Sequence, residues 1–210
     1  MKKNILFIYC LFIGTSLFSQ NDYAPVRSVD AIKKKLTEAS TSVSSIESDF
    51  TQIKHLKALS QDITSKGKFY YQKADKIRLE YTTPVAYLMV INGKKIKIAA
   101  GGKSNTHDIG SNPAMKQMNQ LITACMTGNL DLLGTDYSVE YKENTTSYLL
   151  TVKPSGAGKN YINAIDIYLD KKDFSVQRLK MGEPSGDFTE YIFTNRKNNT
   201  ALSDEKFNIK

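Results

Sequence analysis

The feature that most constrains this fold is an alternation of apolar and polar residues that begins near Ile46 and continues almost to the C-terminus. Successive side chains of a β-strand point to opposite faces of a sheet, so the alternation predicts strands with one buried face. Phe69 and Tyr71 share one face of the first clear segment, and lysines lie on the other. Asn92-Gly93 favours a tight hairpin turn. The sequence therefore predicts a β-meander.

Two segments have helical spacing instead. Ser28 is a suitable N-cap for the first, whose apolar residues between positions 29 and 43 fall on one face. The second follows Asn112 and Pro113, and Gly128 is its expected end. Its broad apolar stripe contains Met115, Met118, Leu121, Ile122, Cys125 and Met126.

About ten strands and two helices predict a mainly β, α+β domain over residues 21–210, with an antiparallel sheet curled around one core. A barrel that spans a membrane needs apolar outer faces on nearly every strand. Here Ile165 and Ile167 alternate with Asp166 and Tyr168, and several other strands carry a charged face. A membrane-embedded barrel is therefore rejected.

The first 20 residues have the pattern of an export signal. Lys2 and Lys3 precede an apolar run that is too short to cross a bilayer, and small residues follow it. Cys10 lies inside the apolar run, so lipid attachment is not expected there. We expect a soluble periplasmic protein whose mature chain starts near Gln20 or Asn21.

Charge and cysteine content narrow the function classes further. Without residues 1–20 the chain keeps 27 basic and 21 acidic residues, a formal charge of +6. This balance suits anionic headgroups, an acidic partner or simply a soluble surface, and export argues against nucleic acid. Cys125 would be the single remaining cysteine, and its apolar surroundings predict a buried, inert thiol.

Candidates for catalysis are few. His55 and His107 are the two histidines, and the sequence has no nucleophile elbow, zinc-protease motif or paired-cysteine metal spacing. We interpret His107-Asp108 as part of a surface loop and Gly101-Gly102-Lys103-Ser104 as a turn. No cofactor, metal or enzymatic activity is predicted.

Several short motifs occur in an order that resembles a known family. They are Asp49-Phe-Thr-Gln52, then Gly67-Lys-Phe followed by Arg78-Leu-Glu-Tyr-Thr-Thr-Pro84, then Asn92-Gly-Lys94, and finally Asn195 with Ala201-Leu-Ser-Asp-Glu-Lys-Phe207. Together they resemble the periplasmic outer-membrane lipoprotein carrier family, called LolA, over roughly residues 29–207.

The resemblance implies an incomplete antiparallel β-barrel whose apolar concave face is covered by lid helices. It also implies a carrier, expected to be a monomer, that takes acylated lipoproteins from an inner-membrane ABC transporter complex to an outer-membrane acceptor that the sequence does not identify. The side chains expected to bind acyl chains are Phe50, Phe69, Tyr71, Ile77, Leu79, Tyr81, Met89, Met115, Met118, Leu121, Ile122, Met126, Ile165 and Ile167. Methionine suits this role because its flexible thioether repacks around variable chains.

One position departs from the family pattern. Family members have an arginine after the lysine of a Lys-Arg-Pro turn, and this arginine holds the lid. Here the turn reads Lys73-Ala74-Asp75, so the arginine is missing. Lys73, Lys76 and Arg78 are candidates to replace it. A regulatory module that senses lipids or lipoproteins on the same fold is the alternative, and a periplasmic hydrolase is a third possibility.

Overall fold

The computed structural model describes residues 23–73, 76–109, 113–155 and 157–209, with only the backbone for residues 113–118 and 157–158. These residues form a twelve-stranded antiparallel sheet, two α-helices and three 3-10 helices. The mainly β fold is confirmed, with twelve strands where the sequence predicted about ten. The predicted signal segment lies outside the described residues.

The strands are β1 (Ala24–Pro25), β2 (Ser45–His55), β3 (Ile63–Gln72), β4 (Lys76–Thr83), β5 (Tyr87–Asn92), β6 (Lys95–Ala100), β7 (Lys103–Asp108), β8 (Tyr137–Glu143), β9 (Ser147–Pro154), β10 (Ala164–Asp170), β11 (Val176–Gly182) and β12 (Phe188–Asn198). The helices are α1 (Val29–Ser42), α2 (Pro113–Thr127) and the 3-10 helices η1 (Leu130–Asp136), η2 (Ala157–Asn160) and η3 (Asp204–Phe207).

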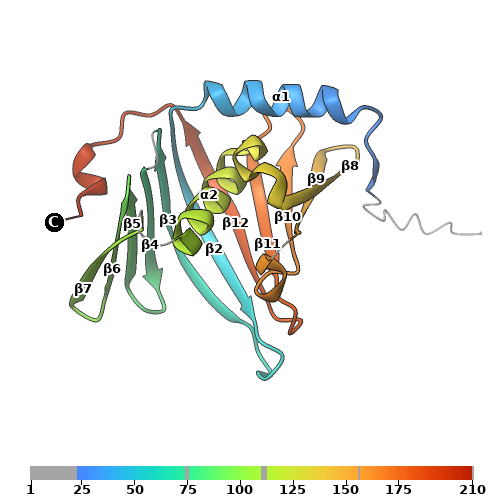
Figure 1. Ribbon diagram of the computed structural model, residues 1–210. Helices are drawn as coiled ribbons and strands as arrows, with labels where there is room; N and C mark the ends of the chain where they lie inside the picture. Colours follow the sequence, from blue (N-terminus) through green and yellow to red (C-terminus); the bar gives the residue numbers. More distant parts are fainter. Residues whose placement is uncertain (1–22, 74–75, 110–112, 156, 210) are drawn as a thin grey trace, which may run out of the picture.

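The sheet is open. Its strand order is β1-β8-β9-β10-β11-β12-β2-β3-β4-β5-β6-β7, and every pair is antiparallel. Strand β12 pairs with β2, which joins the two meanders into one curved sheet (Figure 1). Within the described residues the end strands β1 and β7 do not pair with each other, so the barrel is incomplete, as the sequence led us to expect.

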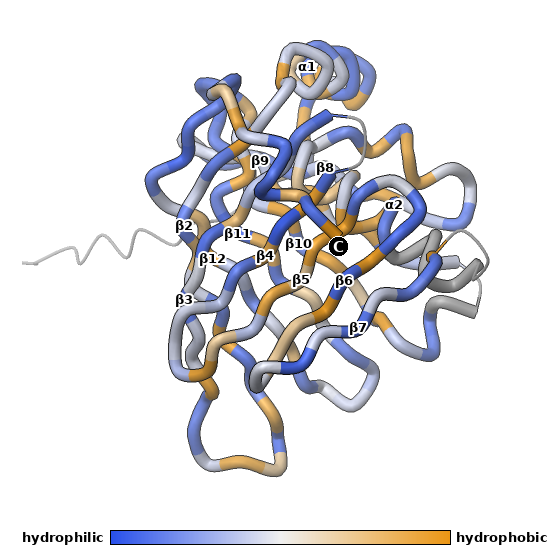
Figure 2. Tube along the Cα trace, turned by 90° about the vertical axis from the view of Figure 1, so that its left-hand side faces the viewer, coloured by the Kyte–Doolittle hydropathy of each residue, from blue (hydrophilic) through white to orange (hydrophobic). Residues whose placement is uncertain are grey.

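The segment around His107 was predicted wrongly as a loop. It is strand β7, which pairs with β6 through Ile96 and His107, and all of its residues are exposed. Figure 2 draws it mostly in blue and white. Backbone pairing forms this edge strand without any apolar face, which is why the hydropathy pattern did not reveal it. Gly101 and Gly102, with φ of 56° and 77°, make the expected turn before it.

Both predicted helices are present. Ser28 caps α1, since its Oγ accepts a hydrogen bond from the backbone N–H of Ala31 at 3.3 Å. Gly128 follows α2 with φ of 75°, a conformation that ends helices. Helix α1 lies along one end of the sheet and α2 crosses its concave side (Figure 1). Among the described residues, no helix is long and apolar enough to cross a membrane.

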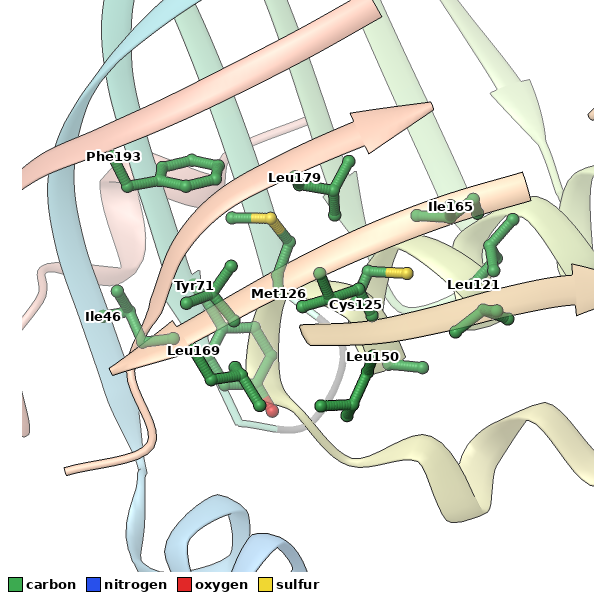
Figure 3. Close-up of a cluster of buried hydrophobic side chains, with 14 of the residues drawn as sticks. Ile46, Tyr71, Leu121, Cys125, Met126, Leu150, Ile165, Leu169, Leu179 and Phe193 are labelled. Atoms are coloured by element: carbon green, nitrogen blue, oxygen red, sulfur yellow. The ribbon is translucent and has the colours of Figure 1, made fainter. Parts of the chain in front are cut away.

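The main core lies on the concave side. Leu121, Cys125 and Met126 of α2 pack among side chains of β10, β11 and β12 (Figure 3). A smaller cluster lies on the convex side, where Phe207 of η3 covers Tyr70 and Val90. This second cluster explains why β5 is apolar on both faces.

Candidate functional site

The strand register arranges the concave face in rows that run across β3, β4, β5 and β6. The side chains of the first row are all buried, those of the second are buried or half-buried, and the third row ends in an exposed alanine. The three rows are Tyr71-Ile77-Ile91-Ile96, Phe69-Leu79-Met89-Ile98 and Gly67-Tyr81-Tyr87-Ala100. Burial therefore decreases from the first row to the third.

A cavity of about 270 Å³ lies on the concave side of the sheet. Residues of the second and third rows form one wall, and residues of helix α2 and of strands β10 to β12 form the rest. Among the described residues its walls carry no charged side chain, and their side-chain heteroatoms are three tyrosine hydroxyl oxygens, one thiol sulfur and three thioether sulfurs. The lining residues are Phe69, Leu79, Tyr81, Tyr87, Met89, Leu121, Ile122, Cys125, Met126, Ile165, Leu179, Met181, Tyr191 and Phe193. Such a surface suits hydrocarbon and repels ions.

Most of the residues expected to bind acyl chains are at this cavity. Its walls contain Phe69, Leu79, Tyr81, Met89, Leu121, Ile122, Met126 and Ile165. Four others are buried in the core beside it and do not line it: Phe50, Tyr71, Ile77 and Ile167. The side chains of Met115 and Met118 lie outside the described residues.

The sequence-based selection left out Tyr87, Cys125, Leu179, Met181, Tyr191 and Phe193, which also line the cavity. Alternation predicted the strands that carry most of them. It did not show that β12 would pair with β2 and bring its inner face to the site. Cys125 is buried as predicted, and burial raises its pKa to about 12, so the thiol stays neutral.

A hydrogen-bonded cluster lies at one end of the cavity. Gln52 Nε2 donates to the hydroxyl of Tyr191 at 2.7 Å, and this hydroxyl is 3.1 Å from that of Tyr81. The ring of Phe50 packs edge-on against both tyrosines, and Tyr87 packs edge-on against Tyr81. Burial raises the pKa of Tyr81, Tyr87 and Tyr191, which keeps all three hydroxyls protonated.

Among the three candidates for the lid latch, Lys73 is the one that contacts α1. Its Nζ donates to the backbone oxygen of Thr41 at 3.1 Å, in the last turn of α1. A cation is favourable there because carbonyl groups are unpaired at the end of a helix. Ala74, which stands where the family has arginine, lies outside the described residues.

The other two latch candidates contact the C-terminal segment. Lys76 Nζ pairs with Asp204 at 2.6 Å, and Arg78 donates to the backbone oxygen of Lys206 at 3.0 Å. Both residues alternate along β4 with the cavity-facing Leu79 and therefore point to the convex side. In this structure they hold η3 against the convex side of the sheet.

The two histidines lie away from the cavity. His55 Nδ1 is 2.7 Å from Asp62 Oδ1, a partner that the sequence did not reveal, and its ring stacks on Phe188. His107 is exposed on β7. Within the described ranges, no three or more histidine, cysteine, aspartate or glutamate side chains are grouped so that they could hold a metal ion.

Solved structures share this fold at low sequence identity. An uncharacterized conserved protein from Thermus thermophilus has 12% identity and a TM-score of 0.54, with 84% of this chain and 92% of that chain covered. MucB has 15% identity and a TM-score of 0.51, and the likeness covers 88% of this chain and 64% of MucB. A LolA superfamily protein from Nitrosomonas europaea has 9% identity and a TM-score of 0.46 over 87% and 98% of the two chains.

Sequence comparison identifies the family. No curated protein matches the chain significantly. The family model described as "Outer membrane lipoprotein carrier protein LolA" matches residues 41–210. This range is most of the chain and includes the residues that line the cavity. This protein therefore belongs to the LolA family.

Proposed function

We propose that this protein is a periplasmic carrier that binds the acyl chains of lipoproteins in the cavity under α2 and moves them from the inner to the outer membrane. The observation that carries the proposal is the uncharged, largely hydrocarbon lining of a cavity on the concave side of the sheet. Family membership supports lipoproteins as the ligand class.

The energetics require such a lining. Each acyl methylene that leaves a bilayer for water costs about 0.8 kcal/mol, so a carrier must replace the bilayer with a comparable apolar surface. Leu79, Met89 and Ile165 provide that surface together with the other wall residues. No proton transfer or bond cleavage is needed, which is consistent with a carrier that is not an enzyme.

The cavity has to enlarge to hold its ligand. Its volume of about 270 Å³ lies at the lower limit of sites for ordinary small ligands, roughly 300 Å³, and several acyl chains need more room. Helix α2 is the element that we expect to move, because it lies over the sheet as a separate layer and, among the strands, its backbone comes close mainly to β11. We therefore assign α2 and η1 as the lid.

Polar atoms in the lid favour this assignment. Asn119 Oδ1, Thr123 Oγ1 and Asn129 Oδ1 are buried with no hydrogen-bond partner in the part of the chain that the structure describes. A buried polar group of this kind costs about 1–3 kcal/mol, which is recovered when the group meets water. Lifting the lid would hydrate these atoms and so offset part of the cost of exposing its apolar face.

The test is release of a triacylated lipoprotein from inner-membrane vesicles that contain the lipoprotein-releasing ABC transporter. The Leu79→Glu variant places a charge in the cavity and should release little lipoprotein. The control, Val85→Glu, adds the same charge at a site that is 69% exposed and should release as much as the wild type. Equal release by both folded variants would contradict a carrier that uses this cavity.

The same assay separates the alternatives. A lipid-sensing module would bind acyl chains without increasing release, and a hydrolase would produce a cleaved lipid. MucB, which shares this fold, has been solved in complex with MucA, so a regulatory role that includes binding of a partner protein is the alternative to test. An outer-membrane acceptor would be required only by the carrier.

A further inference from the structure

We propose that the hydroxyl groups of Tyr81 and Tyr191 form a subsite for the carbonyl oxygen of a bound acyl ester or amide, which fixes the direction of the chain in the cavity. The inference rests on the proposed acyl-binding function and goes further, because it assigns which end of the ligand lies where. An acyl chain held by apolar contacts alone could lie in the cavity in either direction.

The hydroxyl groups of Tyr81 and Tyr191 carry one more proton than their hydrogen bonds use. Gln52 Nε2 donates to Tyr191, so that hydroxyl oxygen already accepts one hydrogen bond. One hydroxyl proton lies between Tyr191 and Tyr81, at an oxygen separation of 3.1 Å, whichever of them donates. Two hydroxyl groups carry two protons, and the second has no acceptor among the described residues. The cluster therefore presents one O–H donor to a ligand.

The chemistry of the walls selects the acceptor. A donor that faces an apolar cavity without a partner is unfavourable, so a carbonyl oxygen that accepts from it is favoured. None of the described lining residues is charged, which makes an ionised carboxylate expensive to bury there. The raised pKa of Tyr81 keeps its hydroxyl a donor across the physiological range. A neutral ester or amide carbonyl satisfies all three conditions.

The position of the cluster sets the direction. Tyr81 lies in the third row, the one that ends in the exposed Ala100, and Tyr81 and Tyr191 are half-buried. Leu121 and Ile165, at the α2 side of the cavity, are buried. The hydrocarbon should extend toward these buried residues, while the carbonyl and the group attached to it remain at the more exposed end.

The experiment measures how well three ligands displace cis-parinaric acid from the purified protein: methyl laurate, lauric acid and tetradecane. They supply a neutral ester carbonyl, a carboxylate and no carbonyl. The double variant Tyr81→Phe, Tyr191→Phe keeps both rings but removes the hydroxyl groups. We expect the ratio of the methyl laurate affinity to the tetradecane affinity to be about 3–10-fold higher in the wild type than in this variant, the change given by one hydrogen bond. Tyr161→Phe, at a residue that is 76% exposed, is the control and should keep the wild-type ratio.

Two outcomes would overturn the inference separately from the proposed function. An equal preference for the ester in the wild type and the double variant would show that the tyrosines do not bind the carbonyl, although acyl binding itself would stand. Tighter binding of lauric acid than of methyl laurate at neutral pH would show that the ligand is a free carboxylate. If none of the three ligands displaced the probe, the proposed acyl-binding function itself would fail.

Discussion

The ring of Phe50 lies so close to the backbone of Gly67 that a Cβ atom at position 67 would be 2.7 Å from Phe50 Cζ. The backbone oxygen of Glu80 is nearer still to that position. Phe50 and Gly67 face each other on neighbouring strands, β2 and β3. Because the same ring packs against Tyr81 and Tyr191, the absence of a side chain at Gly67 lets the tyrosine end of the cavity form.

Gly67→Ala should therefore lower the free energy of unfolding by about 1–3 kcal/mol through overpacking. Denaturation by urea, followed by circular dichroism, measures the change. Gly182→Ala is the matched control in β11, since its Cβ would meet no atom of the described residues closer than the oxygen of Ala164 at 3.8 Å. Similar stabilities for both variants would mean that Phe50 and the backbone at Glu80 can both move away without cost.

The thiol of Cys125 reports on the lid. Its raised pKa of about 12 compares with an ordinary value of about 8.5, so at pH 8 the folded protein should have roughly a thousandfold less thiolate. In a chain that starts at residue 21, where Cys125 is the single thiol, alkylation by iodoacetamide should be slow and should accelerate about tenfold per pH unit from pH 7 to 10. The same chain in urea is the control. If both react equally fast, the lid is open at rest.

Phe207 has no exposed surface, and it attaches the C-terminal segment to the convex face. Its replacement by alanine should lower the free energy of unfolding by about 3–5 kcal/mol. Because this cluster lies across the sheet from the cavity, the folded variant should keep wild-type affinity for cis-parinaric acid. A large loss of affinity in protein that remains folded would show that the two faces are coupled.

Asp49 should contribute to acid sensitivity. Asn195 Nδ2 and Lys68 Nζ each donate a hydrogen bond to the carboxylate of Asp49. These two hydrogen bonds lower the pKa of Asp49. Stability from these contacts is present above the ordinary aspartate pKa of about 3.9 and is lost as the pH falls through the lowered value. Asp49→Asn should therefore show a smaller loss of stability between pH 5 and 2 in urea titrations than the wild type. Parallel curves would mean that other carboxylates dominate.

The sequence predicted what depends on local pattern. Alternation identified the meanders, Ser28 identified the start of α1, and the stripe with Leu121 and Met126 identified the inner face of α2. The pairing of β12 with β2 joins residues more than a hundred positions apart, so no local pattern showed that Tyr191 would lie beside Tyr81. Strand β7 was missed because nothing on it is buried.

The contacts of the latch candidates also could not be predicted from local sequence patterns. Lys76 and Arg78 were selected for their charge and their place in a family motif, and their partners Asp204 and Lys206 are about 130 residues away in the chain. Side-chain direction along β4 separates them from the cavity, and this direction became clear only once the register with β3 and β5 was known.

Native mass spectrometry of the protein purified from its own cells tests the central claim most directly. We predict a complex of one protein with one acylated lipoprotein, or with acyl lipid, for the wild type and for Val85→Glu. Leu79→Glu, expressed and folded to the same level, should carry neither. Acylated ligand bound equally to all three proteins, or to none of them, would contradict an acyl-binding cavity beneath α2.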